Sequence, residues 1–318
     1  MPCVLLVTGL MPTSTAQAVT ELPAVTRVTL DNGLQVLLLP DNSNPFVEIH
    51  FLARAGSALD PVGKEGATAL MADMLINGTA TRSEDDIAQQ VEALGAQLAG
   101  YADLDRVELA GSVITFDPAS LAAFLDIFVD VLRRATFPEE QLRQSKALRL
   151  SAISRLADRH SALADAAMNA LLYGDLPLGR MARLWTIPTI TREDLVAIRD
   201  AVLVPSHGIL AIAGQFDAEW MTRWAKARLG DSEWGAGVCK EEGQNGLCAE
   251  LCAGERCFDN PLARPQAAVP ASRRVLLVDR ADPSLNQVQF RIAAPNPVTL
   301  TASDWGAFRL GTQILGGD

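Results

Sequence analysis

Residues 27–40 read RVTLDNGLQVLLLP, and this stretch decides how the fold begins. Two runs rich in β-branched and aliphatic residues, 27–30 and 34–39, lie on either side of Asp31-Asn32-Gly33. An Asn-Gly pair between two such runs is the strongest local indication of a β-hairpin, because both residues tolerate the backbone angles of the tight turn. The chain is therefore predicted to start with two antiparallel strands.

A third extended run follows at 46–54. Its polar residues Glu48 and His50 alternate with apolar ones, which are Val47, Ile49 and Phe51. Successive side chains of a strand point to opposite faces, so this alternation predicts a strand with one buried face.

Helical patterns come next. Ser83 with Asp86 three residues later resembles a capping box, in which the two side chains bond each other's backbone N–H groups, and it predicts a helix start. Asp117-Pro118 opens a second helix, with proline at the first helical position. Its apolar stripe, with a period near 3.6, comprises Leu121, Phe124, Leu125, Phe128, Val131 and Leu132.

The remaining elements complete a mixed pattern. Further helices are predicted over about 138–157 and 161–173, and from Thr191 onward, where Asp194 takes the third helical position and Ile190 and Leu195 form a hydrophobic staple. Strands are predicted at 96–102, 106–114 and 208–213. A hairpin, then helices, then more strands predict an α+β fold, a mainly antiparallel sheet covered by helices on one face.

The second part of the chain repeats the first weakly. From residue 235 to 273 the sequence is rich in Gly, Pro, Cys and charge, as in an interdomain linker. Residues 287–294 then repeat the alternation of 47–54. Both runs are followed by a loop and an apolar helix that ends in glycine, 67–77 before Gly78 and 303–315 before Gly316. The expected division is a signal peptide at 1–18, a first domain at 19–234, the linker at 235–273 and a truncated second domain at 274–318.

Composition excludes two classes of partner. Of the 318 residues, 27 are Lys or Arg and 38 are Asp or Glu, giving a net charge of −11. A field of that sign repels nucleic acid. The sequence has no apolar run of the roughly 20 residues that a membrane-spanning helix needs.

The first eighteen residues have features of an export signal. An apolar stretch from Val4 to Leu10 precedes Ala16-Gln17-Ala18, an A-x-A pattern typical of signal-peptidase cleavage. The departure from the pattern is at the start, because no Lys or Arg precedes Arg27. The segment is either a signal that directs the protein to the periplasm or a similar exported compartment, or an ordinary chain terminus.

Four cysteines crowd into one segment. Cys239, Cys248, Cys252 and Cys257 have spacings that miss the C-x2-C pairs of structural zinc sites. In an exported protein two disulfides are the favoured interpretation, with three possible connectivities. A zinc or redox module built on the four residues and a set of free thiols stay open.

The order of elements resembles the M16 metallopeptidases, the family of insulinase, pitrilysin and the mitochondrial processing peptidase. The resemblance covers roughly 27–230 and resumes from 275, and no single piece is specific; their order and spacing together carry it. These pieces are Asn32-Gly33-Leu34, Ala55-Gly56-Ser57, Gly63-Lys64-Glu65-Gly66, Asn77-Gly78-Thr79, Leu94-Gly95-Ala96, Phe137 with Glu139 and Glu140, Ala213-Gly214 and Leu315-Gly316-Gly317.

The family's zinc motif, H-x-x-E-H, is degenerate in this chain. Two imidazoles four residues apart share one helix face and can grip a zinc ion, while the glutamate between them acts as general base. Aligned on Gly66 and Gly78-Thr79, the three positions fall on Ala69, Ala72 and Asp73. The downstream ligand aligns with Ala152, or by plain spacing with Leu150, and no carboxylate occurs in 147–153. The resemblance therefore implies no catalytic residue, no metal and no cofactor in this chain.

Other sites have little support in the sequence. The three histidines, His50, His160 and His207, are never four residues apart, and surface or loop positions are expected for them. Neither a G-x-S-x-G elbow nor a P-loop occurs. Asp73 is either a polar remnant lining an empty cleft or, as we expect, a hydrogen-bond partner of a nearby backbone group.

The resemblance implies a non-catalytic subunit of a heteromeric zinc peptidase. Such a chain would help to enclose a chamber, hold a peptide or unfolded polypeptide, and pair with a zinc-bearing M16 subunit. The Arg and Tyr pair that steadies substrate in related proteins would follow residue 318. The alternatives are a structural scaffold of the same fold, like the core subunits of respiratory complexes, and the cysteine module.

Overall fold

The computed structural model describes residues 24–156, 158–174, 176–232, 234–235, 237–239, 250–253 and 255–259. The expected signal peptide at 1–18 and the expected second domain at 274–318 lie outside these residues. Within them, no helix is both long and apolar enough to cross a membrane.

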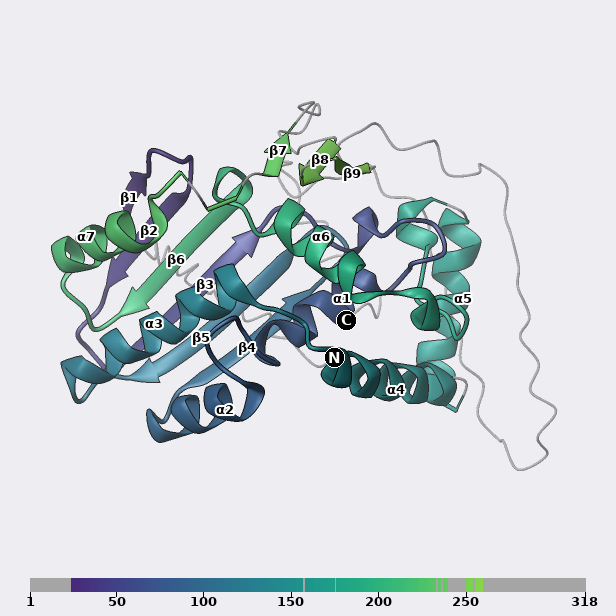
Figure 1. Cartoon of the computed structure of the whole chain (residues 1–318), viewed down its shortest axis with the longest axis horizontal. Coiled ribbons are helices and arrows are strands. Elements are labelled where there is room, and N and C mark those ends of the chain that lie inside the picture. Colours follow the sequence, from purple (N-terminus) through teal and green to yellow (C-terminus); the bar gives the residue numbers. More distant parts are fainter. Residues whose placement is uncertain are drawn as a thin grey trace, which may run out of the picture.

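A six-stranded mixed sheet forms the centre of the fold (Figure 1), in the order β1-β2-β6-β3-β5-β4. All neighbours are antiparallel except β2 and β6, which run parallel, so the predicted mainly antiparallel sheet is confirmed. Its strands are β1 (Thr26–Thr29), β2 (Gln35–Pro40), β3 (Phe46–Ala53), β4 (Gln97–Ala102), β5 (Val107–Ile114) and β6 (Gly208–Gly214).

The predicted hairpin joins β1 to β2. Gly33 takes a φ of 89°, which glycine adopts without the clash that a Cβ would cause, and the N–H of Leu30 donates to the carbonyl of Leu34 over 2.9 Å. The alternation of β3 is confirmed too, because Val47, Ile49 and Phe51 are fully buried while Glu48 is exposed.

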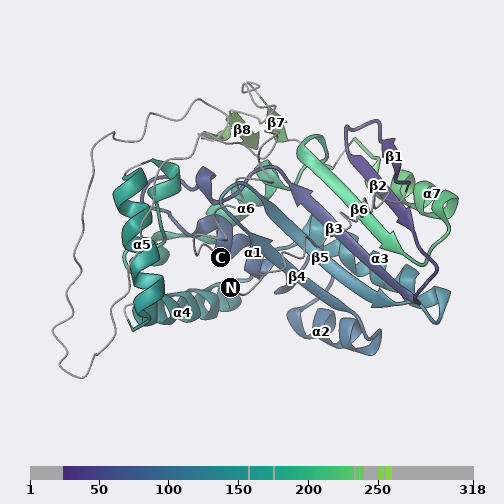
Figure 2. The same cartoon turned by 180° about the vertical axis from the view of Figure 1, so that it is seen from behind.

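Helices cover one face of this sheet. Figure 1 shows α3, α6 and α7 in front of the strands, and Figure 2, from behind, shows the strands in front of α3 and α7. The helices are α1 (Ala67–Asp73), α2 (Glu84–Ala93), α3 (Pro118–Arg134), α4 (Glu139–Leu156), α5 (His160–Tyr173), α6 (Arg192–Val202) and α7 (Ala218–Leu229).

Capping explains several helix boundaries. The predicted capping boxes are confirmed at Ser83 with Asp86 and at Thr191 with Asp194, and Asp117 accepts a hydrogen bond from the backbone N–H of Ala119. Helix α7 is absent from the sequence prediction, although Asp217 caps it by accepting from the N–H of Trp220.

The helix expected over 67–77 is shorter than predicted. Helix α1 ends at Asp73, and a 3-10 turn, Met74–Ile76, continues it. Met74 and Leu75 of this turn are fully buried. A 3-10 turn is common at the end of an α-helix, where the last carbonyl groups lack the partners of a continuing helix.

The apolar stripe of α3 packs on the sheet as predicted. Phe124, Phe128 and Val131 are completely buried, and each such side chain contributes about 1.5–3 kcal/mol relative to full exposure. Gly111 on β5 leaves room for the ring of Phe124, because a Cβ there would lie 2.6 Å from the ring.

A buried ion network ties the loop before α2 to α3. The Asp130 carboxylate is fully buried and accepts hydrogen bonds from Thr79 Oγ1 over 2.6 Å, Thr81 Oγ1 over 2.9 Å and Arg82 Nη1 over 2.6 Å. Arg134 Nε forms an ion pair with it at 2.6 Å. Burial by itself raises the pKa of Asp130, but these donors outweigh it and hold the pKa below its usual value.

Part of the predicted linker forms regular structure. Strands β7 (Gly237–Cys239), β8 (Glu250–Ala253) and β9 (Arg256–Asp259) pair into a small antiparallel sheet next to α6. Leu251 and Phe258 are buried in the main core. These strands were not predicted from the sequence, since a Gly- and Cys-rich composition does not reveal apolar contacts made with a distant helix.

Candidate functional site

Helix α1 is the element that carries the degenerate zinc motif, and a buried aspartate anchors its start. The Asp60 carboxylate accepts from the backbone N–H groups of Gly66 and Thr68 over 2.7 and 2.8 Å, and from Thr68 Oγ1 over 2.6 Å. Burial raises the pKa of Asp60. The sequence analysis missed this residue, because it reaches the start of α1 only when the loop between them folds back.

The inner face of α1 is seated tightly on β4. Leu70, Met71 and Ala72 are essentially inaccessible to solvent. Gly100 makes the close approach possible, since a Cβ at this position would lie only 2.0 Å from the carbonyl oxygen of Ala72. The helix thus keeps a fixed place at the edge of the sheet.

The outer face of α1 carries two of the three motif positions. Ala69 is half-buried and Asp73, four residues later, has a side chain that is 52% exposed. Ala72, the position aligned with the family's general base, is fully buried. At Ala69 and Ala72 the helix therefore offers only methyl groups.

Asp73 pairs with a side chain of α4. Its Oδ2 atom accepts a hydrogen bond from Nη2 of Arg149, which lies 76 residues away in sequence. The backbone partner that we expected for Asp73 is thus replaced by a guanidinium. Partial burial raises the pKa of the Asp73 carboxyl more than Arg149 lowers it.

The expected third-ligand positions lie on the same helix as Arg149. Ala152, one turn further along α4, is exposed, and Leu150 is half-buried and packs against the core. The structure therefore brings α4 against α1, as the resemblance implies, but the group that α4 supplies is a cation and not a carboxylate.

These residues do not fit a zinc ion. Catalytic zinc needs three protein ligands of the His, Cys, Asp or Glu type, and here two positions are alanine and the third is paired with arginine. Elsewhere in the described part of the chain, Glu250, Cys252 and Cys257 lie within 4.8 Å of one another. Two of these three groups are the sulfurs of one disulfide, Cys252–Cys257, and are not available as thiolates.

The other cysteines are only partly described. Cys239 lies in β7, where its backbone pairs with Leu251, and Cys248 lies outside the described residues. The Cys252–Cys257 disulfide joins directly opposite residues of β8 and β9.

The three histidines stay apart. His50 on β3 contacts Glu108 of β5 at 2.6 Å, His160 begins α5, and His207 precedes β6. Burial, together with the nearby Arg54, lowers the pKa of His207. The structure brings none of the three to the motif positions of α1.

Beside α1 the sheet has an edge. Strand β4 pairs with β5 on one side, and no described strand pairs with its other side. Tyr101 of this strand is 57% exposed. An edge strand presents unpaired backbone donors and acceptors, which can pair with an extended peptide.

The fold and part of the sequence are similar to those of known proteins. The α+β architecture of this chain is that of solved M16 peptidase domains. Residues 35–183 match the family described as Insulinase (Peptidase family M16), so this segment of the chain is similar to that family.

Two curated relatives illustrate the likeness. An uncharacterized zinc protease of Rickettsia bellii is 24% identical over 199 residues, covering 62% of this chain and 48% of the relative. The mitochondrial-processing peptidase subunit beta of Bos taurus is 25% identical over 220 residues, covering 68% of this chain and 44% of the relative. The chain thus spans about half the length of the curated relatives it matches.

Solved structures agree on the fold. A peptidase M16 inactive domain from Pseudomonas fluorescens has a TM-score of 0.62 and 23% identity, covering 72% of this chain and 54% of that one. The periplasmic protease PqqL from Escherichia coli has a TM-score of 0.61 and 19% identity, covering 68% and 24%.

Proposed function

We propose that this chain is the non-catalytic part of a heteromeric M16-type zinc peptidase. It supplies a peptide-holding surface and an interface for a zinc-bearing subunit, and carries out no hydrolysis by itself. The single observation that carries the proposal is the contact between Asp73 and Arg149, beside Ala69 and Ala72, at the place where the family resemblance expects zinc ligands.

Electrostatics supports the absence of zinc chemistry. The ion pair places the positively charged guanidinium of Arg149 against Asp73. A divalent cation at that place would be repelled by Arg149 and would have to compete with it for the same carboxylate. The alanines at positions 69 and 72 offer no lone pair in compensation.

The free edge of β4 supports a role in holding peptide. An extended segment can add to this edge through main-chain hydrogen bonds, which do not depend on sequence and suit varied polypeptides. The exposed ring of Tyr101 lies on the same strand and offers an apolar contact for a side chain of that segment.

The names of two similar proteins support the proposal that this chain assembles with a second polypeptide and is exported. The bovine relative is named as a subunit, and a solved neighbour is titled a periplasmic protease. Together with the A-x-A pattern at Ala16-Gln17-Ala18, they support an exported protein that works beside a second polypeptide.

The test combines metal analysis with reconstitution. The purified chain is assayed for bound zinc by elemental analysis and for hydrolysis of a quenched fluorescent peptide library, alone and mixed with an M16 homologue that has an intact H-x-x-E-H. We expect no stoichiometric zinc and no turnover alone, and a higher rate for the mixture than for the homologue.

A variant makes the metal result specific to α1. Stoichiometric zinc that disappears in Asp73→Ala, together with turnover by the lone chain, would overturn the proposal. A mixture no faster than the homologue alone would remove the subunit role and leave the scaffold alternative.

A further inference from the structure

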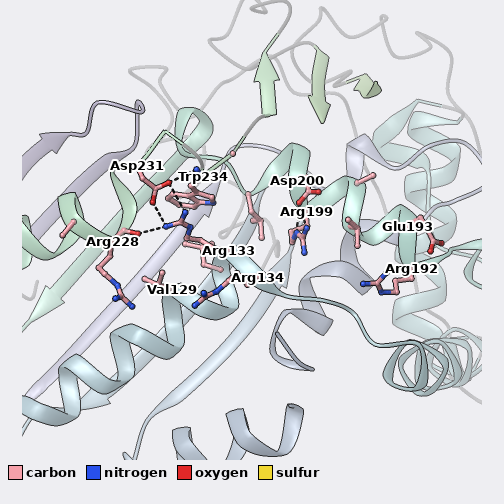
Figure 3. A pocket seen from close by; sticks show the side chains of 16 residues that line it. Val129, Arg133, Arg134, Arg192, Glu193, Arg199, Asp200, Arg228, Asp231 and Trp234 are labelled. Atoms are coloured by element: carbon pink, nitrogen blue, oxygen red, sulfur yellow. Dashed lines mark hydrogen bonds and ion pairs between the residues drawn. The ribbon is translucent and has the colours of Figure 1, made fainter. Parts of the chain in front are cut away.

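A groove of about 1120 Å³ lies on the helical side of the domain (Figure 3). Its described lining comes from α3, α6, the end of α7 and residues 231–235, and not from α1 or α4. The protein is strongly acidic, yet this lining holds more arginines than carboxylates. The arginines are Arg133, Arg134, Arg192, Arg199 and Arg228.

Two of these arginines are held in fixed positions. Arg133 donates from Nη1 and Nη2 to the two carboxylate oxygens of Asp231, over 2.7 and 3.0 Å, and its guanidinium lies 5.6 Å from the ring centroid of Trp234. Arg199 donates to the carbonyl of Ala135 and to the carboxylate of its neighbour Asp200. Both guanidinium groups are largely used by the protein itself.

Two others keep donors available. Arg134 uses Nε in its ion pair with Asp130 at 2.6 Å, and Arg192 uses Nε to donate to the carbonyl of Thr136 over 2.9 Å. The terminal Nη groups of Arg134 and Arg192 have no partner among the described residues. Because the Nε contact holds each planar guanidinium in place, its Nη groups are oriented before a ligand binds.

We propose that this groove docks an acidic segment of a partner polypeptide, independently of the function proposed above. The two arginines with available Nη groups come from different helices, because Arg134 is the last residue of α3 and Arg192 the first of α6. Two separate donors of this kind suit carboxylates spaced along a peptide. The groove also has apolar side chains, among them Leu132, Val196 and Leu203, for the residues between them.

The same lining disfavours a dense polyanion. Glu193, Asp200 and Asp231 lie among the arginines, and each repels the closely spaced charges of a polyphosphate or nucleic acid. A peptide can place its carboxylates at the arginines and apolar groups at these three residues. The favoured occupant is therefore a polypeptide.

The experiment measures binding of a short fluorescein-labelled peptide, in which glutamates alternate with apolar residues, to the full chain by fluorescence anisotropy at low salt. The groove variant is Arg134→Gln with Arg192→Gln, in which glutamine keeps a donor toward the carbonyl of Thr136. The matched control is Arg143→Gln with Arg223→Gln, two exposed arginines outside the groove that each pair with a glutamate on the same helix. Both variants lower the net charge equally.

We expect the groove variant to weaken binding about tenfold and the control to change it less than about twofold, because only the first removes charge-assisted hydrogen bonds. Equal weakening in both variants would mean that binding depends only on the net charge of the chain, and would overturn the proposal. Absence of binding by the wild-type chain would overturn it too. Inorganic polyphosphate binding as tightly as this peptide would assign the groove to another ligand class and overturn the proposal. A thermal melt of each variant shows whether it is folded.

Discussion

Two aspartates of this domain each pair with arginine, and they differ in everything else. Asp130 is a residue of α3, is completely buried, and accepts hydrogen bonds from Thr79, Thr81 and Arg82. Asp73 stands at the end of α1, has a side chain that is 52% exposed, and meets one arginine of α4. The Asp130 carboxylate links α3 to the loop before α2 inside the protein. The Asp73 carboxylate links α1 to α4 at the surface.

This difference distinguishes side chains that maintain the fold from side chains at the surface that the fold does not require. The inner face of α1 is sealed against β4, and Asp130 is surrounded by partners that would be left unpaired without it. The outer face of α1 bears residues whose replacement leaves the packing in place. A domain can therefore keep the architecture of a metallopeptidase while the positions that would bind metal hold other groups.

The largest expected effect is at the buried carboxylate. Asp130→Ala should lower the free energy of unfolding by about 3–5 kcal/mol, because it leaves Nη1 of Arg82 and the hydroxyl groups of Thr79 and Thr81 without their shared acceptor. Urea denaturation measures this loss. The control is Asp126→Ala, on the same helix and 45% exposed, which should cost less than about 1 kcal/mol. Equal losses in the two variants would show that burial does not distinguish these ion pairs.

The next effect concerns the seat of α1. Gly100→Ala places a Cβ 2.0 Å from the carbonyl oxygen of Ala72, so strand and helix must separate, at a cost of about 1–3 kcal/mol. The neighbouring substitution Ala99→Ser, on the opposite face of β4, should change stability by less than about 0.5 kcal/mol. A Gly100→Ala variant as stable as the wild type would contradict the tight seating of α1 on β4.

A smaller effect is expected at the exposed pair. A double-mutant cycle with Asp73→Ala and Arg149→Ala should give a coupling energy of about 0.2–1 kcal/mol, since both side chains are partly in water and screened by salt. Thermal or urea unfolding of the four proteins supplies the numbers. Coupling of several kcal/mol would mean that this pair is as important for the fold as Asp130.

The smallest effect is a difference in pH dependence. The raised pKa of Asp73 means that the folded state holds its proton more tightly, so this residue's contribution is present in acid and decreases as pH rises above its usual value of 3.8. The lowered pKa of Asp130 has the opposite sign, and its contribution is lost as pH falls through that lowered value.

Unfolding of Asp73→Asn and Asp130→Asn across the acid range measures these two contributions. Relative to the wild type, Asp73→Asn should gain stability as pH rises, and Asp130→Asn should lose it. Shifts of the same sign in both variants would contradict the contrast between the two carboxyl groups.

The elements that were predicted correctly depend on neighbours in sequence. The Asn32-Gly33 turn, the capping pairs that begin α2 and α6, and the buried stripe of α3 are all confirmed. Each depends on residues a few positions apart, so the local pattern contains the physical cause. The likeness to M16 peptidases also followed from the order of such elements, and the family match agrees with it.

The missed features depend on contacts between distant segments. Asp60 bonds the start of α1 across a loop, Arg149 reaches Asp73 from a helix 76 residues later, and the β8 and β9 strands are placed by burial of Leu251 and Phe258. The sequence shows alanine at positions 69 and 72 and aspartate at position 73, but not that Asp73 pairs with Arg149.

The sequence by itself determined the α+β plan, the helix starts and the loss of both imidazoles, because hydrophobic period, capping and residue identity are properties of the chain read in order. Only the tertiary structure decided that a guanidinium meets Asp73, that α1 is sealed on β4 and that arginines from separate helices converge on one groove. Such pairings follow from packing, which brings side chains together by shape and burial whatever their separation along the chain.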